Sequence, residues 1–71
     1  MSSIAQPMSE PSRRRLVKVK EAAAYLSISP RILRRLVQEQ EIPIVRLQSR
    51  GPWLIDVRDL DRFVETRKMF A

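Results

Sequence analysis

The sequence contains no cysteine and no histidine. The missing cysteines exclude disulfides and thiolate chemistry, and without either residue the usual zinc sites are excluded as well. Histidine is also the side chain that most often transfers protons near neutral pH. An enzyme of this composition would depend on carboxylates, lysines and hydroxyls alone. We therefore expect no catalytic residues, no metal site and no enzymatic activity.

Long apolar runs are missing too. No stretch approaches the roughly 20 apolar residues that span a bilayer, and the first residues do not form the apolar segment of a signal peptide. A chain of 71 residues has room for one domain, which buries only about 60% of its unfolded surface. We expect one small domain that stays in the cytoplasm and has no membrane partner.

Acidic residues are scarce and unevenly placed. The chain has 14 Lys and Arg against 8 Asp and Glu, a net charge of +6. Residues 13–50 hold ten basic and three acidic side chains, whereas residues 51–71 hold four of each. Such a localised positive field attracts polyanions, of which nucleic acid is the commonest partner. Membrane lipid fits less well, because the basic residues do not lie on one long amphipathic helix.

The N-terminal segment has the composition of a tail. Residues 1–12 contain four serines, two prolines and no apolar period, so they cannot offset their ordering entropy by burial. We predict a flexible tail over residues 1–15, a folded domain over 16–67 and a short tail over 68–71. The first tail ends in Arg13, Arg14 and Arg15, which act either as a solubilising arm or as phosphate contacts when DNA is bound.

Spacing predicts the elements that follow. Alternation over residues 16–19 suits an edge strand, and apolar residues at i, i+3, i+4 and i+7 over 19–26 predict a two-turn helix with small alanines on its apolar face. Ser29 then suits an N-cap and Pro30 a first helical position, so a second helix is predicted over residues 30–40.

The second predicted helix separates its side chains completely. At about 100° per residue, its apolar face consists of Ile32, Leu33, Leu36 and Val37. The opposite face consists of Arg31, Arg34, Arg35 and Gln38. Two short helices joined by a tight turn, the second presenting such side chains, form a DNA-reading helix-turn-helix, since an arginine fork bonds guanine O6 and N7 together. The alternative is an exposed helix that happens to be basic, and the absence of acids on this face argues against it.

A β-hairpin is predicted next. Residues 44–47 and 53–55 suit two strands, and residues 48–52 contain the only glycine of the chain. Arg46 and Arg50 would contact a minor groove or the phosphate backbone, with a solvated turn arginine as the alternative for Arg50. Trp53 is expected in the core rather than as a stacking platform.

A last helix completes the predicted domain. Asp56 suits its N-cap, with Asp59 three residues on in an arrangement like a capping box. Its apolar stripe is predicted as Val57, Leu60, Phe63 and Val64. Strand, two helices, hairpin and helix make a small α/β winged helix-turn-helix.

These residues carry a resemblance to the excisionase family of MerR-type winged-helix domains. The matching segments are residues 17–26 (VKVKEAAAYL), 28–31 (ISPR), 33–37 (LRRLV), 42–43, 45–47, 53, 55 and 59–60. The resemblance implies a second helix in the major groove, a wing in the adjacent minor groove, and phosphate contact by Lys20. The sequence departs from the family pattern at Lys18, often Thr in relatives, at residues 51–52, where a basic pair is usual, and at Leu54, often basic. An outward Leu54 would touch either nothing or a neighbouring protein.

The resemblance also implies a role. Phage members bind adjacent sites, bend DNA and help an integrase to excise a prophage. We therefore expect duplex DNA as the partner in a bacterial host cytoplasm, with integrase and self-association along DNA as further contacts and no cofactor. The alternatives are a small transcriptional regulator and a basic adaptor that docks an acidic protein. The predicted phosphate contacts are Lys18, Lys20, Ser29, Arg13, Arg14 and Arg15.

Overall fold

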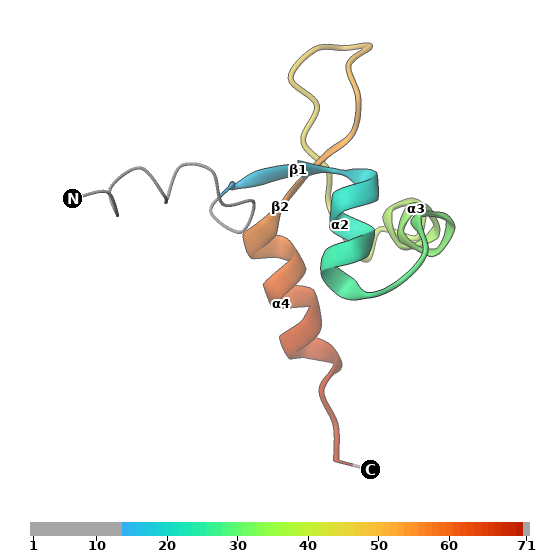
Figure 1. Cartoon of the computed structure of the whole chain (residues 1–71), viewed down its shortest axis with the longest axis vertical. Coiled ribbons are helices and arrows are strands. Elements are labelled where there is room, and N and C mark those ends of the chain that lie inside the picture. Colours follow the sequence, from blue (N-terminus) through green and yellow to red (C-terminus); the bar gives the residue numbers. More distant parts are fainter. Residues whose placement is uncertain (1–13, 71) are drawn as a thin grey trace, which may run out of the picture.

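The structure, a computed structural model, describes residues 14–70. Its elements are β1 (Leu16–Lys18), α2 (Val19–Leu26), α3 (Pro30–Gln38), β2 (Leu54–Asp56) and α4 (Val57–Arg67). Helix α2 contacts both α3 and α4, and a long loop projects between α3 and β2 (Figure 1). This is the predicted winged helix-turn-helix. Residues 1–13 and 71, most of the predicted tails, lie outside the described residues.

Every element contributes to one core. Its buried apolar residues are Val17, Ala22, Ala23, Leu33, Ile42, Ile55 and Leu60. The two alanines lie on the face of α2 that packs against the other elements, and their small side chains allow α3 to approach closely. The core therefore fixes the angle at which α3 is presented.

The core is narrower than the apolar pattern predicts. Ile32 and Val64 were expected on buried faces, but they are 40% and 38% exposed. When few other elements pack against a short helix, they cover only the middle of its apolar stripe. In α3 that middle is Leu33, and Ile32 lies about 100° round the helix from it. These two inward assignments were wrong.

The sheet pairs the first strand with the last. Strand β1 runs antiparallel to β2, with Leu16 opposite Asp56 and Lys18 opposite Leu54. The strand predicted over residues 44–47 is reduced to one bridge, in which Val45 and Leu54 exchange hydrogen bonds of 2.7 and 2.9 Å. Pro43 directly precedes this segment and Pro52 directly precedes the returning one. Because neither proline has an amide hydrogen, both limit further pairing. The wing (residues 46–53) is therefore a projecting loop closed at its base (Figure 1).

Asp56 joins the sheet to the last helix. Its side chain accepts a hydrogen bond from the Arg58 amide at 2.9 Å, as predicted for an N-cap of α4. The Arg15 guanidinium donates to the same carboxylate at 3.0 Å, and the Arg15 carbonyl accepts from the Val57 amide at 2.8 Å. The Arg58 amide first, and then Arg15, hold the pKa of Asp56 below its ordinary value. Within residues 14–70 no helix has the length and apolarity to cross a membrane.

Candidate nucleic-acid interface

The turn between α2 and α3 has the geometry that a helix-turn-helix requires. Ser27 adopts a left-handed conformation with φ 61°, and the Ser27 and Ile28 amides return to the carbonyls of Ala24 and Ala23. Ser29 then caps α3, because its hydroxyl accepts from the Ile32 amide at 3.2 Å. The predicted roles of Ser29 as N-cap and Pro30 as first residue are confirmed.

Helix α3 presents the predicted polar face to solvent. The exposed residues on this face are Arg31, Arg34, Arg35 and Gln38. Leu33 is fully buried behind them. The helix ends at Gln38, two residues earlier than predicted, and Gln40 leaves it in a left-handed conformation with φ 62°. All four polar side chains remain within the regular helix.

The wing carries two arginines in different situations. Arg46 donates to the Ser49 carbonyl at 3.3 Å, and the Gly51 amide donates to the Gln48 carbonyl at 2.9 Å. Arg46 therefore helps to hold the turn of the wing. Arg50 is exposed at that turn, where its side chain is available to a partner.

Ion pairing divides the basic residues of the described chain into two sets. Six of them pair with carboxylates: Arg14, Arg15, Arg58, Arg62, Arg67 and Lys68. The cations without such a partner among residues 14–70 are Lys18, Lys20, Arg31, Arg34, Arg35, Arg46 and Arg50. This second set comes from the junction of β1 and α2, from α3 and from the wing. Because a nearby carboxylate cancels much of a cation's field, the net positive potential is concentrated at those three elements.

Two of the predicted phosphate contacts pair with carboxylates of the fold. Arg14 lies 3.4 Å from the Glu21 carboxylate and Arg15 lies 3.0 Å from that of Asp56, so both are engaged within the fold. Arg13 lies outside the described residues. Lys18 is exposed, and its amide donates to Glu21 at 3.2 Å. Glu21 therefore fixes the start of α2, where relatives are expected to have a capping Thr.

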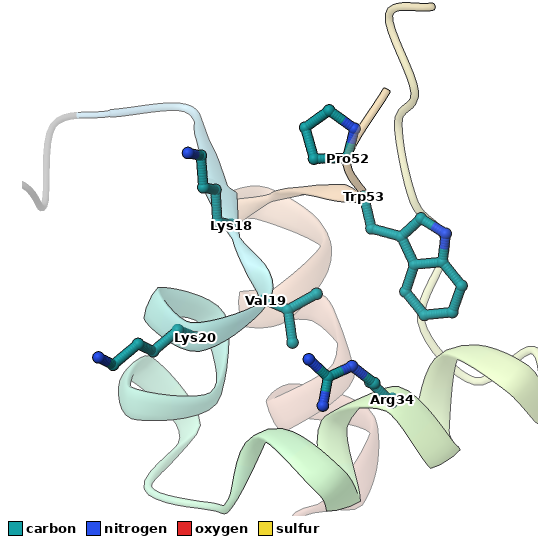
Figure 2. A pocket seen from close by; sticks show the side chains of 6 residues that line it. All are labelled: Lys18, Val19, Lys20, Arg34, Pro52 and Trp53. Carbon is teal, nitrogen blue, oxygen red and sulfur yellow. The ribbon is translucent and has the colours of Figure 1, made fainter. Parts of the chain in front are cut away.

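Trp53 was predicted in the core, and this assignment was wrong. It is half-buried, outside the core cluster, and lines an open groove of about 410 Å³ with Lys18, Val19, Lys20, Arg34 and Pro52 (Figure 2). The strand register explains this position. Leu54 is opposite Lys18, the last residue of β1, so Trp53 continues beyond the sheet to the start of α2. Sequence alternation alone places Trp53 on the same face as buried Ile55 and does not reveal where the sheet ends.

Leu54 marks the other side of the wing base. It is half-buried and lines a separate hollow with Leu47, Gln48, Gly51 and Pro52. Leu47, which is 72% exposed, extends this apolar surface into solvent. A contact between Leu54 and a neighbouring protein stays a prediction.

The comparison with protein families agrees with this geometry. Residues 16–68, from β1 to just beyond α4, match the family described as the helix-turn-helix domain. The chain belongs to this helix-turn-helix family. No curated protein and no solved structure matches the chain. Helix-turn-helix domains bind duplex DNA through their second helix, so this chain is a DNA-binding domain of a typically non-enzymatic family.

Proposed function

We propose that this helix-turn-helix protein is an excisionase of the MerR-like type. It binds duplex DNA sequence-specifically at adjacent sites, bends it and directs an integrase toward excision of a phage or prophage. It acts on DNA in the cytoplasm of a bacterial host. The observation that carries DNA binding is the division of the cations: in the described chain, those without carboxylate partners belong to the β1–α2 junction, α3 and the wing.

Helix α3 would lie in the major groove and supply the sequence reading. Its first half carries Arg31, Arg34 and Arg35, and Gln38 follows one turn later. Arginine recognises guanine through a bidentate contact, and glutamine recognises adenine in the same way. A nine-residue helix reaches few base pairs, so useful discrimination requires several copies at adjacent sites. This supports self-association along DNA and an extended complex that an integrase can recognise.

The wing would supply the bend. Arg50 stands at its turn, and Arg46 steadies that turn through Ser49. A narrow minor groove concentrates negative potential and attracts inserted arginines. DNA that curves toward the protein brings the wing and α3 into contact together. The contact energy of the wing then offsets the cost of bending.

The experiment combines three measurements on duplex DNA that carries the phage attachment region. Footprinting should show protected segments at a regular spacing, and permuted fragments should show a position-dependent shift in gel mobility caused by bending. If about six phosphates are contacted, log affinity should fall against log salt with a slope near −5. In an assay with the cognate integrase, excision should require the protein.

Each alternative gives a different result. Specific binding at a promoter, without bending or stimulation of excision, would identify a transcriptional regulator and refute the excisionase assignment. Absence of salt-sensitive duplex binding at low ionic strength would refute DNA binding and favour an adaptor for an acidic protein.

A further inference from the structure

The groove beside Trp53 holds residues that the reading of bases does not require. We propose that it binds one sugar-phosphate unit of the DNA backbone, with Arg34, Lys18 and Lys20 contacting the phosphate and Trp53 contacting the deoxyribose. The proposal rests on the proposed DNA binding and changes the role of Arg34. Arg34 then contacts the DNA backbone, and Arg31, Arg35 and Gln38 are the residues that read bases.

The chemistry of the lining matches such a unit. Three lining residues, Lys18, Lys20 and Arg34, are cationic, and the other three, Val19, Pro52 and Trp53, present apolar surface. No acidic residue lines the groove. A nucleotide backbone likewise combines an anionic phosphate with a carbon-rich sugar ring. The cationic side of the groove therefore suits the phosphate, and the apolar side suits the sugar.

The directions of Arg34 and Trp53 support this assignment. Figure 2 shows the Arg34 guanidinium extending from α3 toward Val19 at the start of α2. The indole of Trp53 stands on the opposite side, between the base of the wing and α3, while Lys18 and Lys20 lie at the other rim with their ammonium groups extending away from the indole (Figure 2). Among residues 14–70, neither lysine nor Arg34 has a carboxylate partner, so the three charges are available to an anion.

The position of the groove fits the path of the DNA. If α3 occupies the major groove and the wing the adjacent minor groove, one strand of backbone separates the two. That strand must cross the protein between α3 and the base of the wing. The groove is lined by residues from both of these parts and from the β1–α2 junction. Backbone contacts of this kind fix the register of a protein on DNA without reading sequence.

The test compares Arg34→Ala with Arg35→Ala, adjacent arginines on the same helix. The probes are a duplex selected by the wild-type protein from a random pool and a scrambled duplex of the same composition. We expect Arg34→Ala to weaken binding to both duplexes equally, by about tenfold, and to reduce the salt slope by about 1. Arg35→Ala should weaken mainly the selected duplex. Arg62→Ala, which removes an equivalent charge from α4, should bind both like the wild type.

Trp53 offers an independent readout because it is the only tryptophan in the chain. Its fluorescence should change when either duplex saturates the protein. Trp53→Ala should weaken both duplexes by about fivefold through lost apolar contact, whereas Trp53→Phe should stay close to the wild type. Thermal melting of each variant separates loss of folding from loss of contact.

Two results would overturn the proposal. One is a loss on Arg34→Ala confined to the selected duplex, which would show that Arg34 reads a base. The other is unchanged Trp53 fluorescence at saturation together with wild-type affinity of the folded Trp53→Ala variant. In both cases the wild-type protein still binds DNA, so the proposed function is judged separately. The DNA binding on which the proposal rests fails if the wild type itself shows no salt-sensitive binding.

Discussion

Ser29 combines a structural role with a predicted DNA contact, and two substitutions separate them. Its hydroxyl accepts from the Ile32 amide at 3.2 Å and so caps α3. Ser29→Ala removes this acceptor and leaves an amide of the first turn without its protein partner. Loss of a serine cap costs about 1 kcal/mol of stability. For a domain of this size, that corresponds to a fall in melting temperature of about 4–8 °C.

Ser29→Asp should behave in the opposite way toward the fold. Aspartate caps helices as well as serine does, and its charge interacts favourably with the N-terminus of α3. The variant should therefore melt at or above the wild-type temperature. If the start of α3 approaches a DNA phosphate, however, the added negative charge should weaken duplex binding by about tenfold at low salt, with less effect at high salt.

The assays are thermal melting by circular dichroism and duplex binding at two salt concentrations. An unchanged melting temperature for Ser29→Ala would refute the capping argument. Wild-type affinity of Ser29→Asp at low salt would show that the start of α3 lies away from the phosphates, and the docking of α3 would need revision. Because one variant alters mainly the fold and the other mainly the charge, the two results are read independently.

Three further predictions follow from the core, the sheet and the wing. Leu33→Ala should cost about 2–5 kcal/mol, because Leu33 is fully buried at the centre of α3, and denaturant unfolding would measure this loss. Since the pKa of Asp56 is lowered from 3.8, its stabilising contribution should be complete above that value and disappear as the pH falls below it. Asp56→Asn, which keeps a capping oxygen, should flatten this acid dependence in a pH series of melts. In the wing, Arg50→Ala should weaken all duplexes similarly, whereas Arg46→Ala should also loosen the turn held at Ser49, which hydrogen exchange of the wing amides would detect.

The helix-turn-helix could be predicted from sequence because its determinants are local. Ser29 and Pro30 define the start of α3 through their own backbone chemistry, and the spacing of apolar residues defines its buried side. The same periodicity failed at Ile32, since the width of a buried stripe depends on how much of the neighbouring elements covers it. Periodicity predicts which side of a helix is buried, whereas the tertiary contacts determine how wide the buried side is.

The wing and its groove depend on a pairing that sequence patterns do not specify. Residues 44–47 and 53–55 alternate in a way typical of a hairpin, yet β2 pairs mainly with β1 and shares only the Val45 bridge with the earlier segment. This register carries Trp53 past the end of the sheet to the start of α2. Trp53 is therefore half-buried among cations because of this long-range pairing. Judged by residue type alone, a large apolar tryptophan would be placed in the core.

The acidic residues explain how a chain with modest net charge concentrates its field. Asp56, placed to cap α4, also holds Arg15 and Arg58, while Glu21 accepts from the Lys18 amide at the start of α2 and pairs with Arg14. The Glu41 carboxylate likewise pairs with the Arg67 guanidinium at 2.6 Å. Each of these carboxylates pairs with a cation that lies outside α3, the wing and the β1–α2 junction. The local rules that form the helices therefore also determine which positive charges stay available, and those belong to α3, the wing and the β1–α2 junction.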